Sequence, residues 1–179
     1  MRSRWMHRFG AAGALLIALA CASPAQSIPK SQLGSVMQMV AGARIEITYR
    51  RPVARGRTLF GDLVPWGRTW TPSADSAVVF STSAPIQING AELAAGTYSL
   101  WAIPQQQESW TVIFNAVPHT FHLAYPDGRD VLRVHATPKR GEHMETLAFY
   151  FPLVDADSAT LYLHWGATIV PLSIRARPH

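Results

Sequence analysis

The segment Ala43-Arg44-Ile45-Glu46-Ile47-Thr48-Tyr49 decides the fold class, because apolar and polar side chains alternate along it without a break. Successive side chains of a β-strand point to opposite faces of a sheet, so the two isoleucines and Tyr49 share one face. The polar residues between them share the other face. Such a half-buried strand is typical of an antiparallel sheet that has one face on the core.

Segments of the same kind follow at short spacing through the rest of the chain. The pair Asn89-Gly90 within residues 86–93 tolerates the positive φ angles of a type I′ turn, which predicts a hairpin. Residues 96–103 and 109–115 have large side chains on both faces, which predicts central strands covered on two sides. Further strands are expected at residues 76–81, 131–137, 146–153, 159–165 and 167–174, with turns at residues 138–141 and 155–158.

Beyond the N-terminal 25 residues, no stretch has the periodicity of an amphipathic helix. We therefore predict an all-β fold, an antiparallel β-sandwich of roughly nine strands with no substantial helix in the mature chain. The alternation points His135 and His164 outward from the sheets. The residues expected to be buried between the sheets are Ile45, Ile47, Tyr98, Leu100, Val112, Phe114, Val134, Leu147, Phe149, Leu161 and Leu163.

The first 25 residues have the features of a secretory signal peptide. Three arginines within residues 2–8 form a basic region, residues 10–22 form a short apolar region, and Ser23-Pro24-Ala25 is a small-residue cleavage site. The apolar run is shorter than the roughly 20 residues that a membrane-spanning helix needs. We expect a periplasmic or secreted protein that is cleaved after Ala25 and keeps no transmembrane segment.

Cys21 offers a second form of export, in which the cysteine receives a lipid anchor. A lipoprotein signal has Leu three residues before the Cys, whereas Ala18 occupies that place and Leu19 follows it. Cleavage after Ala25 is therefore favoured over lipidation. In both cases the folded part has no disulfide, because Cys21 is the chain's single cysteine, and the core alone must hold it together.

Removing residues 1–25 from the 179-residue chain leaves 154 residues, enough for one domain with a substantial core. We predict a signal peptide at 1–25, a flexible leader at 26–35 and a single β-sandwich domain at 36–176. Three of the 16 Lys and Arg residues leave with the signal peptide, so 13 remain against 11 Asp and Glu, a net charge of +2 instead of +5. This small charge argues against nucleic acid as a partner.

The connection after the first clear strand, residues 50–70, is here called the Arg/Trp loop, because it holds five arginines and two tryptophans. Pro52 and Pro65 prevent a strand from running through it. Long ordered loops on a rigid scaffold often position binding groups, and a guanidinium offers a bidentate fork to carboxylates and phosphates. The predicted residues for binding a small anionic or sugar-like ligand are Arg51, Arg55, Arg57, Trp66, Arg68 and Trp70.

A structural interpretation of the same loop competes with ligand binding, and arginines and tryptophans in a loop of this kind have a structural role more often than a binding one. The arginines would then cap loop carbonyls and pair with Asp62 and Asp75, since an ordered loop needs donors for its own backbone. The tryptophans would plug the open end of the sandwich, because aromatic rings dominate core burial.

No complete catalytic or metal-binding motif is present. The chain has neither Gly-x-Ser-x-Gly nor His-Glu-x-x-His, and Asp155-Ala156-Asp157 is too short for a calcium loop. His119 and His122 would share a face on a helix, but Pro118 argues against one. We therefore predict no catalytic residue, no metal ligand and no cofactor, and we lean away from an enzyme.

Two other functions stay open at this point. Acid pairs such as Glu142 and Glu145 are compatible with a hydrolase that acts on an envelope or extracellular substrate. A structural or assembly module of the cell envelope would instead use an uncovered sheet edge.

Five segments together identify a resemblance. They are Tyr49-x-Arg51-Pro52-x-x-Arg55-Gly56-Arg57, Phe60-Gly61-x-Leu63-Val64-Pro65-Trp66-Gly67, Leu93-x-Ala95-Gly96-Thr97-Tyr98-Ser99-Leu100-Trp101-x-Ile103-Pro104, Trp110-Thr111-Val112-Ile113-Phe114-Asn115 and Asp130-Val131-Leu132-Arg133-Val134. In order and spacing they resemble domain-of-unknown-function family 2911, a family of bacterial exported proteins. The resemblance covers nearly the whole mature chain and implies no established activity.

The chain departs from the family pattern after the loop. The sequences of family members resemble Trp-Arg-Thr-Gly-Ala-Asn-Glu-Ala at this place. In this chain Trp70 is followed by Thr71-Pro72-Ser73-Ala74-Asp75-Ser76-Ala77. If the polar groups of the family pattern form a site, this chain has altered or lost it.

Overall fold

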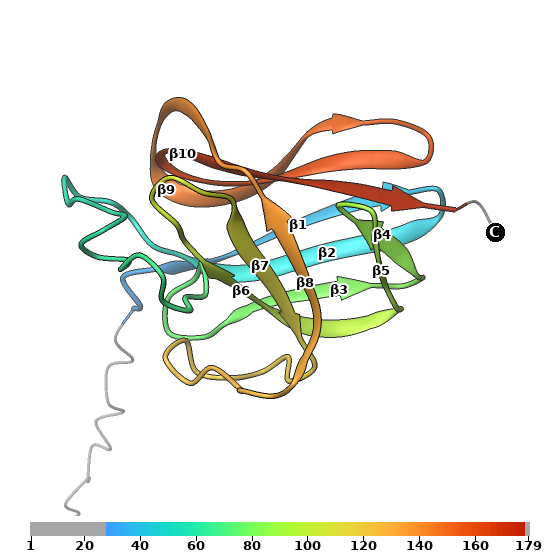
Figure 1. Ribbon diagram of the computed structural model, residues 1–179, viewed down its shortest axis with the longest axis horizontal. Coiled ribbons are helices and arrows are strands. Elements are labelled where there is room, and N and C mark those ends of the chain that lie inside the picture. The colour runs from blue at the N-terminus through green and yellow to red at the C-terminus, as the bar shows by residue number, and fades with distance from the viewer. Residues whose placement is uncertain (1–27, 178–179) are drawn as a thin grey trace, which may run out of the picture.

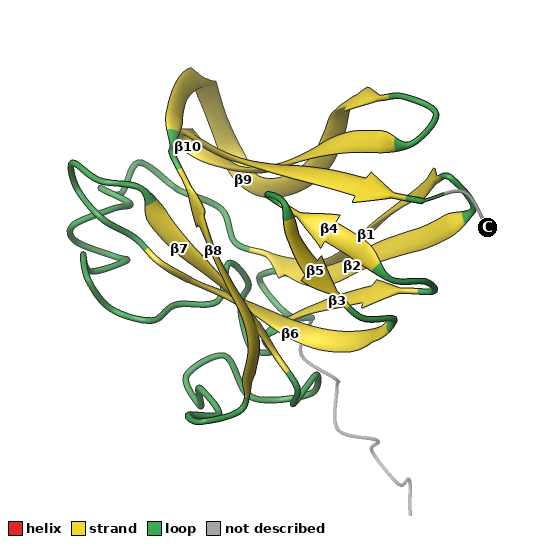
Figure 2. Ribbon diagram, turned by 45° about the vertical axis from the view of Figure 1, so that its right-hand side comes forward, coloured by secondary structure: helices red, strands yellow, loops and turns green. Residues whose placement is uncertain are grey.

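A computed structural model describes residues 28–177, which form two antiparallel sheets packed face to face (Figure 1). Within these residues there are strands and loops but no helix (Figure 2). The six-stranded sheet has the order β1-β2-β3-β6-β7-β8, and the four-stranded sheet has the order β5-β4-β10-β9. The strands are β1 (Gln32–Val40), β2 (Ala43–Arg51), β3 (Val78–Thr82), β4 (Ile86–Ile88), β5 (Ala91–Leu93), β6 (Gly96–Ile103), β7 (Trp110–Asn115), β8 (Asp130–Ala136), β9 (Lys139–Val154) and β10 (Ser158–Ala176).

The predicted all-β sandwich is confirmed, with ten strands in residues 28–177 where roughly nine were expected. Asn89 and Gly90 have φ angles of 47° and 84°, so the predicted hairpin turn forms between β4 and β5. The predicted signal peptide lies outside the described residues. Among the residues described, no helix has the length and apolarity needed to cross a membrane.

The boundaries of three elements differ from the prediction. β1 begins at Gln32, inside the segment 26–35 that was expected to be a flexible leader. β9 begins at Lys139, inside the expected turn at 138–141. The two strands expected at 159–165 and 167–174 form the single strand β10, because Gly166, with φ of 57°, forms part of a bulge that bends the strand without ending it.

The core lies between the two sheets, and every residue predicted to be buried there is buried. A smaller cluster of Ala77, Trp101 and Ile113 lies on the other face of the six-stranded sheet. Tyr125, from the connection between β7 and β8, packs edge-on against Trp101 with ring centroids 5.2 Å apart. Both faces of β6 and β7 are therefore covered, as the large side chains on both faces predicted.

His164 does not point to solvent, which corrects the prediction made from the alternation. Its exposed fraction is only 5%. The Tyr150 hydroxyl lies 3.0 Å from His164 Nδ1, and the carbonyl oxygen of Glu142 lies 3.0 Å from Nε2. The bulges in β10 curl the β9–β10 ribbon (Figure 1), so that Glu142 lies beside a side chain that a flat sheet would leave exposed.

Candidate functional site

The Arg/Trp loop lies at one end of the sandwich and is attached to both sheets (Figure 1, left). At its start, the Ala54 N–H donates to the Glu145 carbonyl of β9 at 2.8 Å. At its end, Trp70 exchanges two backbone hydrogen bonds of 2.8 and 2.7 Å with Ala102 of β6. Because its two ends pair with different sheets, the loop closes this end of the core.

Five aromatic rings fill the space beneath the loop: Phe60, Trp66, Trp70, Trp110 and Trp165. Trp70 and Trp165 are stacked, with ring centroids 6.1 Å apart and planes 11° apart. Phe60 packs edge-on against Trp110, with centroids 4.9 Å apart. These contacts are those expected of a plug, and they hold the loop in one conformation.

Gly61 fits the loop around Trp66. Its φ is 95°, and an added Cβ would lie 2.6 Å from Trp66 Nε1. Only glycine adopts this φ without strain, and only a missing side chain leaves room for the indole. The loop conformation is therefore encoded locally as well as by its attachments.

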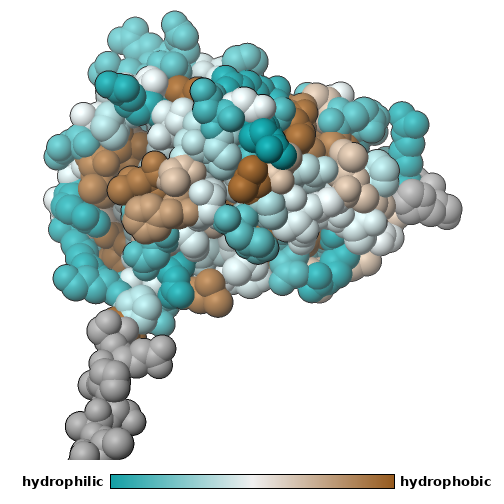
Figure 3. Space-filling model, turned by 90° about the horizontal axis from the view of Figure 1, so that it is seen from below, coloured by the Kyte–Doolittle hydropathy of each residue, from teal (hydrophilic) through white to brown (hydrophobic). Residues whose placement is uncertain are grey.

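A cleft of about 390 Å³, here called the Arg/Trp cleft, opens beside the loop. The loop contributes apolar residues together with Arg55 and Arg57, while His122 and Leu123 come from the β7–β8 connection. Lys30 comes from the segment before β1. Seen from below, apolar side chains gather at this end of the molecule, with hydrophilic ones around them (Figure 3).

The charged side chains that line the cleft are all cationic. Lys30, Arg55 and Arg57 line it, and no Asp or Glu is among its lining residues. Two carboxylates lie just outside the lining: Glu145 accepts a hydrogen bond from the Arg55 backbone N–H at 2.6 Å, and Asp75 follows the lining residue Ala74 in the chain. Hydrogen bonds from His143 and from this N–H lower the pKa of Glu145, so the carboxylate is held in its charged form.

The two arginines of the cleft differ in what holds them. Arg57 donates from Nε to the Ala54 carbonyl at 2.9 Å and from Nη2 to the Val53 carbonyl at 2.7 Å, so it caps the loop while facing the cleft. Arg55, at φ of 53°, uses only its backbone N–H in this way. Within residues 28–177, its side chain has no hydrogen bond or ion pair. Arg55 is the guanidinium that a ligand could engage without breaking an existing contact.

The structure brings together three of the six residues predicted for binding: Arg55, Arg57 and Trp70. The other three do not line the cleft. Arg51 donates from Nε to the Leu147 carbonyl of β9 at 3.1 Å, as the structural interpretation expects. Trp66 packs in the aromatic plug, and Arg68 is exposed outside the cleft.

Sequence reasoning missed the other side of the cleft. Lys30, His122, Leu123 and Trp165 reach it from segments far from the loop in sequence. Trp165 of β10 is buried and borders the cleft from the core side. No local pattern marks the other three, because only the tertiary fold brings their segments to this end.

The segment that departs from the family pattern borders the cleft. Thr71 Oγ1 donates to the Leu100 carbonyl at 2.8 Å and accepts from the Val78 N–H at 3.0 Å. Ser73 Oγ accepts from the Arg50 N–H at 2.9 Å, and the Asp75 N–H donates to His122 Nδ1 at 2.6 Å. In this chain the Thr71 and Ser73 hydroxyls and the Asp75 backbone N–H are thus engaged in holding the fold.

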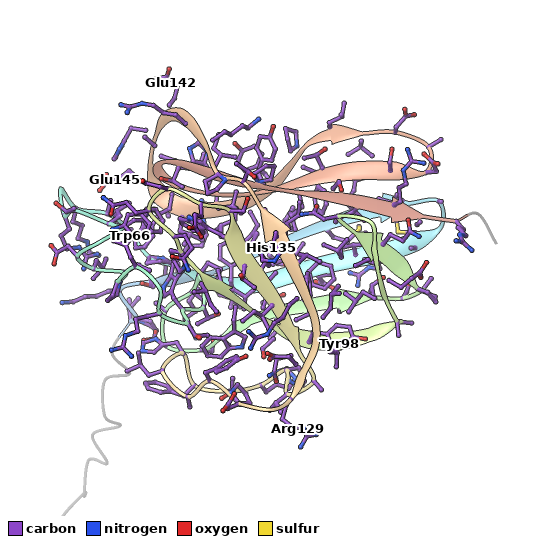
Figure 4. All side chains as sticks on the ribbon, viewed as in Figure 1. Trp66, Tyr98, Arg129, His135, Glu142 and Glu145 are labelled. Carbon is purple, nitrogen blue, oxygen red and sulfur yellow. The ribbon has the colours of Figure 1, made fainter. Side chains whose placement is uncertain are left out.

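Other arrangements of ionisable side chains were also candidates from the sequence. Glu142 lies at the top of the curled β9–β10 ribbon, and Glu145 lies lower, beside the Arg/Trp loop (Figure 4). His143 Nε2 is 2.9 Å from Glu145 Oε2, which makes an exposed ion pair when the histidine is protonated. In the described part of the chain, no group of three or more His, Cys, Asp or Glu residues is arranged to hold a metal ion.

The fold and the site define a β-sandwich whose ordered, arginine- and tryptophan-rich loop closes one end and borders a cationic cleft. The chain belongs to the family described as "Protein of unknown function (DUF2911)", which matches residues 31–174. The resemblance seen in the sequence is thereby confirmed. No curated protein and no solved structure matches the chain.

Proposed function

We propose that the protein is exported to the periplasm or beyond and binds a small anionic or sugar-like ligand in the Arg/Trp cleft, without catalysis. One observation carries the proposal: three cationic residues, Lys30, Arg55 and Arg57, line a cleft that has no carboxylate among the described residues that line it. Like charges at short distance repel one another, and an anion between them relieves that repulsion.

The size and lining of the cleft support the same proposal. Its volume of about 390 Å³ is at the small end of the range for small-molecule sites. The half-buried Trp70, which is stacked on the buried Trp165, supplies flat apolar surface next to the charges. A ligand with one acidic group and a body of about one ring matches this combination.

The alternatives rest on other features. Glu142 and Glu145, which suggested a hydrolase, lie at separate places on β9 (Figure 4). β1 is an edge strand of nine residues with exposed Leu33, Met37 and Met39, and this observation makes an assembly module the second candidate. Self-association of the protein, measured by sedimentation, would support it.

The test is a thermal-shift screen of the mature protein against small carboxylates, phosphates and acidic sugars. Binding to the native state raises its free energy of unfolding by about 2.7 kcal/mol at a hundred times the Kd. We expect Arg55→Ala to abolish the shift and to leave the melting temperature of the free protein nearly unchanged, because within residues 28–177 its side chain makes no hydrogen bond or ion pair.

Arg51→Ala is the matched control, since it lies on the same connection but outside the cleft. It should lower the melting temperature through loss of the bond to the Leu147 carbonyl and leave the ligand-induced shift intact. If no anion produces a shift, or if Arg55→Ala keeps the full shift, the proposal is wrong.

A further inference from the structure

We infer that the ligand of the Arg/Trp cleft is an apolar organic acid, an aromatic or aliphatic carboxylate, and not a polyhydroxylated sugar acid. This inference rests on the proposed function and narrows it. It follows from which polar groups of the cleft are still able to bond with a ligand.

The hydroxyl groups at the cleft are largely used inside the protein. Thr71 Oγ1 already both donates and accepts, and Ser73 Oγ accepts from the Arg50 N–H while it lies 3.4 Å from the Ala74 carbonyl. Both residues are buried. His122 Nδ1 is occupied by the Asp75 N–H, which leaves only Nε2 for a ligand.

Few other neutral polar side chains reach the cleft. Ser31 is the remaining hydroxyl, and no Asp, Glu, Asn or Gln is among the lining residues. A sugar brings several hydroxyl groups, and each one that enters without a partner loses its hydrogen bonds to water. Beyond the cations that hold the acidic group, the described side chains of the cleft therefore offer a ring of hydroxyls only Ser31 and His122 Nε2.

Exposed apolar side chains from two connections also line the cleft. Leu63 of the Arg/Trp loop is 42% exposed, and Leu123 of the β7–β8 connection is 80% exposed. When a ligand covers large apolar side chains that are exposed beside a cleft, the burial of their surface favours binding. Pro52, Val53 and Val64 extend the apolar lining within the loop itself.

Together these features divide the cleft into two zones. Lys30, Arg55 and Arg57 receive the carboxylate, with Arg55 free to form a bidentate pair. The half-buried indole of Trp70 and the two exposed leucines receive the body of the acid. The body needs to be about one six-membered ring or a short chain to fit the cleft.

The experiment compares two acids of similar shape, cyclohexanecarboxylate and glucuronate, by titration calorimetry on the mature protein. Both have a carboxylate on a six-membered ring, and they differ mainly in their hydroxyl groups. We expect glucuronate to bind at least about tenfold more weakly, since a tenfold change corresponds to about 1.4 kcal/mol, within the range for a single unmatched polar group. Cyclohexylmethanol, which has no charge, should bind more weakly than either acid.

Two variants locate the zones. Leu123→Ser should weaken cyclohexanecarboxylate about three- to tenfold and leave glucuronate unchanged, because it removes apolar contact alone. Arg55→Gln should weaken both acids. Leu153→Ser, at a leucine that is 65% exposed on β9 and outside the Arg/Trp cleft, is the control and should change neither. Both leucines are too exposed for the substitutions to disturb folding.

The outcomes distinguish a failure of this inference from a failure of the proposed function. If glucuronate binds as tightly as cyclohexanecarboxylate or more tightly, this inference is overturned and the proposed function stands. If Leu123→Ser leaves both affinities unchanged, the apolar zone is wrongly placed and the inference is overturned as well. If neither acid binds and no other anion does, the proposed function itself fails.

Discussion

Asp130 fixes the connection that supplies one wall of the cleft. Its carboxylate accepts hydrogen bonds from Asn115 Nδ2 at 2.8 Å, from the Tyr125 hydroxyl at 2.6 Å and from Arg133 Nη2 at 2.6 Å. Burial alone would raise the pKa of Asp130, but the hydrogen bonds from Tyr125, Asn115 and Arg133 outweigh it and lower the pKa. The folded protein therefore favours the charged carboxylate more than the unfolded chain does.

This arrangement predicts a pH-dependent loss in Asp130→Asn. At pH 7 the substitution should cost about 1–3 kcal/mol of unfolding free energy, the range for a charged hydrogen-bonded group. Because the folded pKa lies below the unfolded value of about 3.9, the contribution is complete above that value and is lost as the pH falls through the folded pKa. Urea unfolding of both proteins across this acidic range should show the difference shrinking.

Asp62→Asn is the control for this prediction, because Asp62 is exposed and has no hydrogen bond or ion pair within the described residues. It should leave the free energy of unfolding nearly unchanged at each pH. A gap between wild type and Asp130→Asn that stays constant down to the lowest pH would contradict the assignment of Asp130 as the stabilising charge.

The three arginines at the start of the Arg/Trp loop show what the sequence could not predict. Arg51, Arg55 and Arg57 have the same chemistry and lie within seven positions of one another. Which of them is free depends on where the carbonyls of Val53, Ala54 and Leu147 come to lie, and on the positive φ of Arg55. A motif can indicate that a loop matters, but it does not state which guanidinium is already bonded.

At the scale of elements, β9 is the strand that joins the core to the loop. Phe149 of β9 is buried, and its ring packs edge-on against Tyr49 of β2 with centroids 4.8 Å apart. The Phe149 N–H donates to the Tyr49 hydroxyl at 2.8 Å. Tyr49 thus bridges the two sheets next to the point where the Arg/Trp loop begins.

Phe149→Ala should therefore lower the free energy of unfolding by about 3–5 kcal/mol, through lost burial and the cavity that remains. Chemical denaturation measures this loss. Leu153→Ala on the same strand is the comparison, and its loss should stay within about 0.5 kcal/mol because Leu153 is exposed. A loss below about 1 kcal/mol for Phe149→Ala would mean that the ring does not occupy the core.

The strands could be predicted because their signal is local. A side-chain period of two, together with turn residues such as Asn89-Gly90, is written in consecutive positions. The continuity of β10 could not be predicted in the same way, because a glycine such as Gly166 indicates a turn and a bulge equally well. The burial of His164 depends on that bulge. Because the bulge was not predicted, the outward direction predicted for His164 was also wrong.

At the scale of the whole molecule, the cleft is assembled from parts distant in sequence. Lys30 and Trp165 both line it although most of the chain lies between them. The sequence predicted only the contributions of the Arg/Trp loop, where candidate residues lie close together. Contacts between a β7–β8 connection and a loop after β2 depend on sheet order, and strand order could not be read from the pattern.

Export is the prediction that belongs to the whole chain. The basic region, the short apolar region and the small-residue site before Gln26 predict a processed protein in the periplasm or medium. Mass spectrometry of the secreted or periplasmic protein should find a chain that begins at Gln26. A chain that begins at Met1, or one that begins at a lipidated Cys21, would contradict cleavage after Ala25.

The stacked pair Trp70–Trp165 has an optical consequence. Two indoles with nearly parallel planes and centroids 6.1 Å apart are close enough for their electronic transitions to couple. One indole belongs to the loop and the other to β10, so the coupling exists only while the loop is closed over the end of the sandwich. A circular dichroism signal from this pair therefore reports whether the loop is packed against the end of the sandwich, without an added label.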